Sequence, residues 1–172
     1  NGTRTKEKAF NNRITTKIDY SLPIKTGKLE IGYQGNNITR LNDSRSYDLS
    51  VSDLSYTETP YNNSAVNFRR SIYGVYATYG NEFKKFTYSL GLRAEYTDRR
   101  LNSGLNDYNY FKWNVFPTAH FGYNIDDSHQ IYASYSSRIQ RPQGWQIEPQ
   151  LIRTGINSFF QGNQDVKPEL IN

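Results

Sequence analysis

Apolar and polar residues alternate along several stretches of this chain, most strictly between Phe86 and Thr97. One set of alternate positions there is apolar, and the intervening set is mostly polar or charged. The apolar set is Phe86, Tyr88, Leu90, Leu92, Ala94 and Tyr96, and the other is Thr87, Ser89, Gly91, Arg93, Glu95 and Thr97. Because successive side chains of a strand point to opposite faces, this pattern predicts a long strand with one apolar face.

The same alternation predicts six long strands in an all-β, antiparallel, up-and-down meander. The expected strands cover residues 12–21, 28–38, 68–80, 85–98, 111–124 and 129–138 of a single segment, 1–172. Tight turns are expected at 22–27, 80–83 and 124–128, and long loops at 39–67, 98–110 and 139–172. Since alternate connections of a meander lie at the same end, we expect the tight turns to gather at one end and the long loops at the other.

The length of the apolar faces points to a membrane. Phe86 to Tyr96 is ten residue steps, or about 33 Å of strand at about 3.3 Å each. A tilt of about 40° reduces this to roughly 25 Å, the height of the apolar band on outer-membrane barrels. Trp113 to Tyr123 repeats both the length and the aromatic ends, which suit the interface between lipid and water. The side chains expected to face lipid are Phe86, Tyr88, Leu90, Leu92, Ala94, Tyr96, Trp113, Val115, Ala119, Phe121 and Tyr123.

A soluble β-sandwich is the alternative reading, because its strands also alternate. Sandwich strands are usually shorter, about 5–6 residues, and a second sheet of the same chain would cover the apolar face. Such a protein would be secreted or periplasmic and would bind carbohydrate through exposed Tyr and Trp. Pro117 also bears on the strand assignment, because proline cannot donate a ladder hydrogen bond. We therefore expect a β-bulge at Pro117.

Composition and charge narrow the functional classes. No apolar run reaches the roughly 18 residues that a transmembrane helix needs. The chain has no cysteine and two histidines, which argues against a disulfide framework and a metal site. Its net charge of +5 is spread out, so no nucleic-acid partner is expected. No phosphate loop, nucleophile elbow or calcium loop is present, so neither an enzyme nor a bound cofactor is predicted.

The C-terminal part of the chain carries a recognisable signature. The stretch YSSRIQRPQGWQIEP, residues 135–149, and then QGNQDVKPELIN, residues 161–172, resemble the C-terminal barrel of TonB-dependent outer-membrane receptors. The match is to the Bacteroidetes-type outer membrane protein β-barrel family, and residues 73–100 and 114–142 resemble its strand pairs. That family usually has Pro after Gly-Asn and Leu after Asp, where this chain has Gln164 and Val166. The motif residues are Arg138, Arg141, Pro142, Gly162, Asn163, Asp165, Lys167, Pro168 and Glu169.

The resemblance implies a location in the bacterial outer membrane and energy-coupled uptake of a bulky solute. Barrels of this family have 22 strands, so six strands would form about a quarter of the wall. The implied partners are outer-membrane lipid, an unknown solute, and a plug domain and TonB-type energy coupler that both lie outside this segment. An isolated segment is expected to be an open curved sheet whose bare edges pair with another copy.

Two groups of site residues are expected on this basis. Arg93, Glu95 and His120 lie on the polar face and are predicted to point into the lumen, where Arg93 and Glu95 would form a charge pair against the plug. Arg138, Arg141 and Trp145 lie after the last strand and are candidates for binding the solute at the loop end. For Arg93 and Glu95 the alternative to a charge pair against the plug is a role in the path of the solute. For the loop residues the alternative to solute binding is packing of one loop against another.

Overall fold

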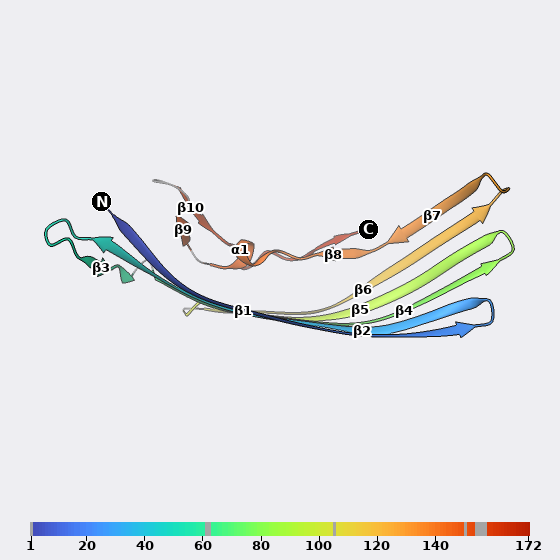
Figure 1. Cartoon of the computed structure of the whole chain (residues 1–172), viewed down its shortest axis with the longest axis horizontal. Helices are drawn as coiled ribbons and strands as arrows, with labels where there is room; N and C mark the ends of the chain where they lie inside the picture. The colour runs from blue at the N-terminus through green and yellow to red at the C-terminus, as the bar shows by residue number, and fades with distance from the viewer. Residues whose placement is uncertain (1, 61–62, 105, 150, 154–157) are drawn as a thin grey trace.

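The computed structural model describes residues 2–60, 63–104, 106–149, 151–153 and 158–172. Figure 1 shows one long, curved sheet with the C-terminal segment lying over its concave side. The strands of the sheet are β1 (Thr3–Ile24), β2 (Gly27–Leu49), β3 (Tyr56–Glu58), β4 (Ser64–Phe83), β5 (Phe86–Asn102), β6 (Asp107–Asn124) and β7 (Gln130–Ser136). The order is β1-β2-β4-β5-β6-β7, with β3 attached to β2. All pairs are antiparallel, so the predicted open meander is confirmed.

The strands run well beyond the residues expected from alternation. β2 continues through residues 39–49 and β4 begins at Ser64, so most of the expected loop 39–67 is strand. The expected loop 98–110 is likewise wrong, because only residues 103–106 separate β5 from β6. In these distal parts both faces carry polar residues, but each strand still pairs with at least one neighbouring strand. A hydrogen-bonded ladder therefore continues where the hydrophobic signal ends.

One tight turn lies four residues later than expected. Residues 80–83 belong to β4, and the chain reverses at Lys84 and Lys85, between the paired residues Phe83 and Phe86. Lys84 has a φ of 54°, as Lys25 has a φ of 52° in the turn between β1 and β2. Two-residue hairpin turns favour such left-handed residues because their twist matches that of the strands.

The expected bulge at Pro117 is wrong. The register between β5 and β6 is unbroken and pairs Pro117 with Leu92. The Pro117 carbonyl accepts a 3.0 Å hydrogen bond from the Ser137 amide, so its nitrogen also faces the β7 side. Pairing with β7 stops at Thr118 and Ser136. The proline thus lies where no further ladder bond is required of it.

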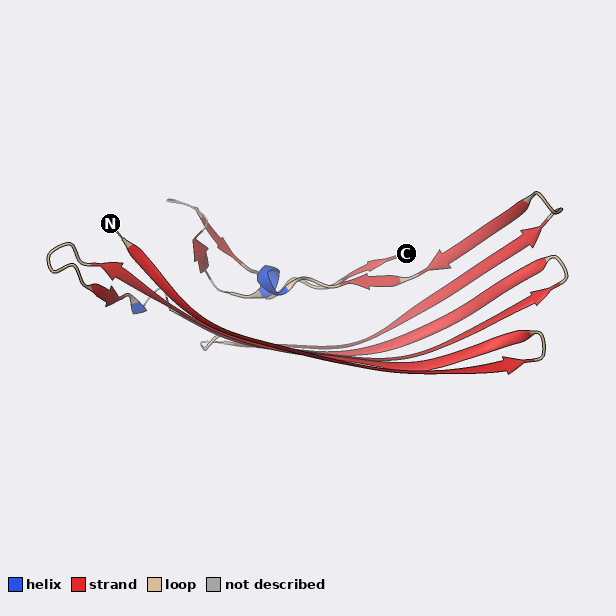
Figure 2. Cartoon of the chain, viewed as in Figure 1, coloured by secondary structure: helices blue, strands red, loops and turns tan. Residues whose placement is uncertain are grey.

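Residues 139–172, which were expected to form one long loop, contain several short elements. The elements after β7 are β8 (Arg138–Gln140), α1 (Gly144–Ile147), β9 (Leu151–Arg153), β10 (Phe159–Gln161) and β11 (Glu169–Ile171). β8 pairs with β11 and β9 with β10, each as a small antiparallel sheet. Figure 2 shows these short elements above the concave face of the main sheet. We call residues 137–149 and 158–172 the tail.

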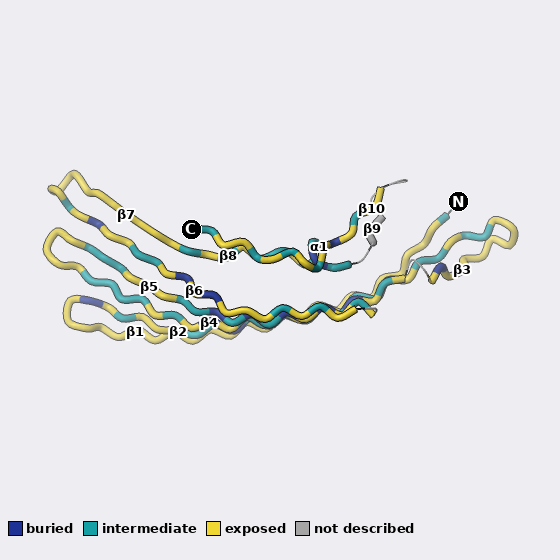
Figure 3. The backbone as a smooth tube through the Cα atoms, turned by 180° about the vertical axis from the view of Figure 1, so that it is seen from behind, coloured by how far each residue is buried: buried dark blue, intermediate teal, exposed yellow. Residues whose placement is uncertain are grey.

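The tail and the sheet share the largest buried cluster in the described part of the chain. It combines Ile147 of the tail with four side chains of the concave face, and Tyr108 and Val166 pack against it. The four are Ile38, Val66, Phe68 and Leu101. Burial in Figure 3 is accordingly concentrated in the middle of the sheet and in α1, whereas β1 is exposed throughout.

The opposite, convex face is apolar and uncovered. Leu92 is 55% exposed and Val115 56%, and Trp113 reaches 65%. In the described residues both small sheets lie on the other side (Figure 1). The arrangement therefore lacks the second sheet over the apolar face that a β-sandwich requires.

Candidate functional site

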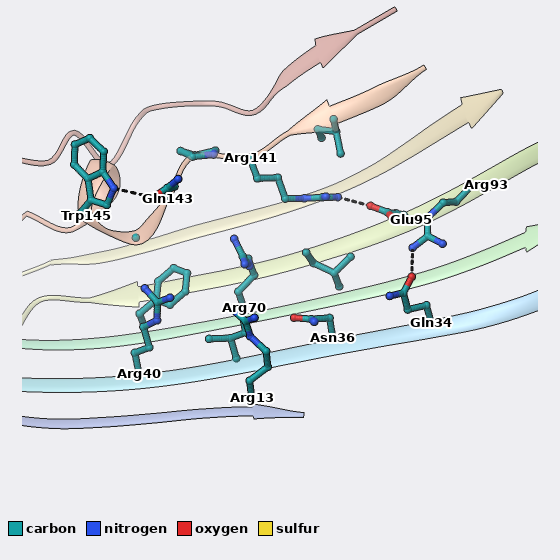
Figure 4. Close-up of a pocket in the computed structure, with 16 residues that line it drawn as sticks. Arg13, Gln34, Asn36, Arg40, Arg70, Arg93, Glu95, Arg141, Gln143 and Trp145 are labelled. Atoms are coloured by element: carbon teal, nitrogen blue, oxygen red, sulfur yellow. Dashed lines mark hydrogen bonds and ion pairs between the residues drawn. The ribbon is translucent and has the colours of Figure 1, made fainter. Parts of the chain in front are cut away.

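The main concavity lies between the sheet and the tail. It is a cavity of about 730 Å³, and Figure 4 shows side chains of five different segments converging on it. We call it the arginine cavity, because five arginines line it. They are Arg13, Arg40, Arg70, Arg93 and Arg141. The other labelled lining residues are Gln34, Asn36, Glu95, Gln143 and Trp145.

Strand register brings the arginines together. Ile38 of β2 is paired with Arg13 of β1 on one side and with Arg70 of β4 on the other. Paired residues of adjacent strands point to the same face, so all three belong to the concave face. Arg40 follows two positions after Ile38 and therefore shares that face.

Glu95 links the sheet to the tail. Its Oε1 accepts a hydrogen bond of 2.6 Å from Arg93 Nε, and its Oε2 accepts one from Arg141 Nη2. Arg93 Nη2 also donates to Gln34 Oε1 at 3.1 Å. Glu95 is only 6% exposed, so its charge depends on these two guanidinium groups.

Gly74 makes room for this network. A Cβ at Gly74 would lie 2.8 Å from Arg93 Nη2 and 3.3 Å from Glu95 Cγ. Gly74 is paired with both Gln34 and Glu95, so it occupies the centre of the network. Any side chain at this position would displace the Arg93 guanidinium from Glu95.

Positive charge exceeds negative charge in the arginine cavity. Glu95 is the one carboxylate residue among its lining residues, against five arginines. The Nε atoms of Arg40, Arg70 and Arg141 are buried and have no hydrogen-bond partner within the described structure. The guanidinium groups of Arg40 and Arg70 lie 5.9 and 6.0 Å from the ring centre of Phe68. These two cations are thus held beside the same buried ring.

The tail closes one side of the arginine cavity. Trp145 Nε1 donates to Gln143 Oε1 at 2.9 Å, and the Trp145 ring lies 5.3 Å from that of Phe160. Gly162 donates to the Glu148 carbonyl, and Asn163 donates to that of Gln146. A Cβ at Gly162 would be 2.3 Å from the Glu148 carbonyl oxygen, so this contact requires glycine.

Glu148 is the titratable group of this turn. Burial raises the pKa of the Glu148 carboxyl above its ordinary value, and the positive charge of Arg40 partly opposes this increase. The desolvated carboxylate therefore disfavours the packed tail when it is ionised.

Only some of the site residues predicted from the sequence line the arginine cavity. Arg141 and Trp145 line the arginine cavity, whereas Arg138 belongs to β8 and lines an adjoining cavity of about 400 Å³ that shares Arg141 with it. Arg93 and Glu95 form the expected ion pair. His120 is exposed and paired with Ser89, which puts it on the same face as Arg93. Contact of these residues with a plug, lumen or solute stays a prediction.

Sequence reasoning did not single out Arg13, Arg40 or Arg70. Arg13 fell on the polar set of its strand, but a strand pattern gives no register with its neighbours. Arg40 lay in a stretch expected to be loop. The signal that could have found these residues is their shared face, which appears only once β1, β2 and β4 are aligned.

The described residues contain neither a cluster of metal ligands nor a membrane-spanning helix. No group of three or more His, Cys, Asp or Glu side chains lies close enough together to hold a metal ion. Over the same residues, no helix combines the length and the hydrophobicity needed to cross a membrane.

Comparison with known proteins identifies the fold and the family. No curated protein matches the chain. The structure of the ferric citrate transporter FecA in its unliganded form is similar, with a TM-score of 0.55 and 13% sequence identity. The likeness covers 80% of this chain and 21% of FecA, so the chain spans about a fifth of that transporter. The model of the outer membrane protein beta-barrel family matches residues 1–172. The chain therefore belongs to this family of the bacterial outer membrane.

Proposed function

We propose that the chain forms part of the barrel wall of a TonB-dependent receptor that takes up a bulky solute across the outer membrane. The observation that carries the proposal is the division of one open sheet into two unlike faces. The convex face exposes Leu, Val, Phe and Trp side chains, and the concave face carries charged residues and the tail. This is the distribution of a transmembrane barrel wall around a polar lumen.

Lipid is the proposed partner of the convex face. The side chains assigned to it are Phe86, Tyr88, Leu90, Leu92, Ala94, Tyr96, Trp113, Val115, Ala119, Phe121 and Tyr123. The seven of these that are large and exposed range from Tyr123, at 38%, to Trp113, at 65%. Strong exposure of large apolar groups costs free energy in water and none in hydrocarbon.

The plug domain and the energy coupler are proposed partners of the whole receptor. The concave face would look toward the plug, and Arg93, Glu95 and His120 would point into the lumen. The end strands β1 and β7 would continue the barrel with strands of the same protein; a segment excised from it would pair edge to edge with another copy. We expect no catalytic activity from this part of the wall.

The soluble β-sandwich alternative is wrong for this chain. It required a second sheet over Leu90, Leu92 and Val115, and these side chains are 47%, 55% and 56% exposed. The family match over the whole chain also belongs to outer-membrane barrels. Carbohydrate binding by a periplasmic sandwich therefore has no support here.

A solute-depletion experiment tests uptake. Cells that carry the whole protein, and cells that lack its gene, are grown in the same complex medium, and mass spectrometry follows the loss of solutes from the medium. We expect at least one bulky solute to be depleted only by the first strain, and depletion to stop when a proton-motive-force uncoupler is added. Equal depletion by both strains, or depletion that the uncoupler does not change, contradicts energy-coupled uptake.

A further inference from the structure

The arginine cavity has more cationic groups than its own residues can pair. Glu95 occupies Arg93 and Arg141, and no salt bridge within the described structure involves Arg13, Arg40 or Arg70. Gathering like charges in a partly buried space costs free energy unless an anion offsets them. The excess charge is therefore a feature that a bound anion would stabilise.

Three of the arginines that line the cavity have a hydrogen-bond donor without a partner in the described structure. The Nε atoms of Arg40, Arg70 and Arg141 are shielded from solvent and have no partner in the described structure. A guanidinium group offers five donors in a planar fork that fits the two oxygens of a carboxylate or phosphate. Arg40 is paired with Phe68 across β2 and β4, and Arg70 lies two positions after Phe68 on β4. Both guanidinium groups therefore lie near this ring, which is 2% exposed.

The arginine cavity is large enough for a small molecule, and the tail closes one side of it. Its volume of about 730 Å³ falls within the roughly 300–1,000 Å³ of known small-molecule sites. Arg141 and Trp145 reach it from the tail, while Arg13, Arg40 and Arg70 reach it from three adjacent strands (Figure 4). The cationic groups thus surround the space from two sides, which suits an anion with several charged oxygens.

We propose that the arginine cavity binds a solute with several oxyanion groups, carboxylate or phosphate, and that Arg13, Arg40 and Arg70 hold these groups. The solute would offset the excess positive charge of the guanidinium groups that line the arginine cavity. The inference rests on the proposed function only for the route by which the solute reaches the lumen. Binding itself is a property of the purified protein.

Calorimetric titration of the whole protein, purified in detergent at low ionic strength, tests the proposal. The probe is tricarballylate, which has three carboxylates, and the control ligand is its neutral triamide. We expect the protein to bind tricarballylate and not the triamide. Replacing one guanidinium by an uncharged amide, in Arg70→Gln or Arg40→Gln, should weaken binding about tenfold or more.

Arg69→Gln is the matched control variant. Arg69 precedes Arg70 on β4, is exposed and points to the opposite face, so this variant removes the same charge from the other side of the wall. Its binding should equal that of the unmodified protein. Arg70→Lys keeps the charge but loses the fork, and it should bind with intermediate strength. Migration of the unheated protein on gels shows that each variant has folded.

Three results would overturn the site. They are equal weakening by Arg69→Gln and Arg70→Gln, equal binding of the triamide, and absence of tricarballylate binding by the unmodified protein. The last result is also the one expected if carboxylates of the receptor's own plug fill the cavity. None of them affects the solute-depletion experiment, so failure of this site and failure of energy-coupled uptake are distinguishable.

Discussion

Glu95 is the residue through which the tail and the wall are joined electrostatically. It is buried, and it accepts hydrogen bonds from Arg93 on its own strand and from Arg141 on the tail. Its partners are themselves partly buried, with 29% and 18% of their side chains exposed. A charge in such surroundings is costly to leave alone, so each member of this group depends on the other two.

We expect Glu95→Gln to loosen the tail. Without the carboxylate, Arg93 and Arg141 face each other as like charges, and docking of the tail should weaken by about 2 kcal/mol. Amide hydrogen exchange at residues 138–149 measures this as faster local opening. Asp98→Asn is the control, because it breaks the exposed pair of Asp98 with Arg100 on the other face of β5. Equal exchange in both variants would contradict the role of Glu95.

Glu148 should make tail docking depend on pH. Its ordinary pKa is 4.5, and burial raises it in the folded protein. The contribution of Glu148 to tail docking is therefore most favourable below about pH 4.5, where its carboxyl is protonated in both states. Stability is lost as pH rises through the raised pKa, because the detached tail ionises more readily than the packed one.

The variant Glu148→Gln tests this dependence. Its melting temperature should match that of the unmodified protein at pH 4 and exceed it at pH 8, since glutamine remains neutral throughout. Thermal unfolding in the same detergent at several pH values provides the measurement. A difference between the two proteins that does not change with pH would argue against a raised pKa at Glu148.

At the scale of elements, the tail is attached to the wall by one fully buried side chain. Ile147 is 1% exposed and packs against four apolar side chains of the concave face. It lies in α1, which has only four residues. So short a helix is not stable alone, and its conformation depends on this contact and on Gly162 and Asn163, which hydrogen-bond to its end.

We expect Ile147→Ala to detach the tail locally. Removing most of a fully buried isoleucine side chain costs about 3 kcal/mol. Leu170→Ala is the matched control, because Leu170 also lies in the tail but is 54% exposed. Trypsin cleavage after Arg138 should accelerate in the first variant and stay unchanged in the second. Unchanged cleavage in both would show that Ile147 does not anchor the tail.

The sequence predicted the elements where one face is apolar, and it failed where both faces are polar. The alternation in residues 86–97 identified β5, because the polarity of each side chain there indicates which face of the sheet it lies on. Residues 39–49 of β2 carry Asn, Asp, Ser and Arg on both faces, so nothing in their pattern distinguishes strand from loop. The ladder with β1 and β4 holds them in the sheet.

The candidate site was predictable only in part, for a related reason. Arg93, Glu95, Arg141 and Trp145 could be named, two from strand alternation and two from a motif. Their proximity in space could not be predicted, because the tail folds back through contacts between residues far apart in the sequence. The arginine cavity forms only when three strands are in register and the tail folds back over them. Neither arrangement can be read from the local sequence pattern.

At the scale of the whole molecule, the exposed convex face requires hydrocarbon. We expect Leu92→Arg to reduce the folded protein recovered from outer-membrane fractions. Leu92 lies near the middle of the apolar face, where an arginine costs about 2–4 kcal/mol. His120→Arg is the control, because His120 shares the concave face with Arg93 and should tolerate the charge. Heat-modifiable migration on gels measures the folded fraction, and equal recovery of both variants would contradict the orientation of the wall.

The length of β2 has a consequence for the cell surface. Its 23 residues extend about 76 Å at about 3.3 Å each, or roughly 58 Å in height at a tilt of about 40°. The apolar band occupies only about 25 Å of this height. With the tight turns on the periplasmic side, as the proposed function implies, roughly 30 Å of hydrogen-bonded wall stands beyond the apolar band as a stiff collar. A molecule that enters the lumen from outside the cell would pass along this ordered, charge-rich wall before it reaches the level of the lipid.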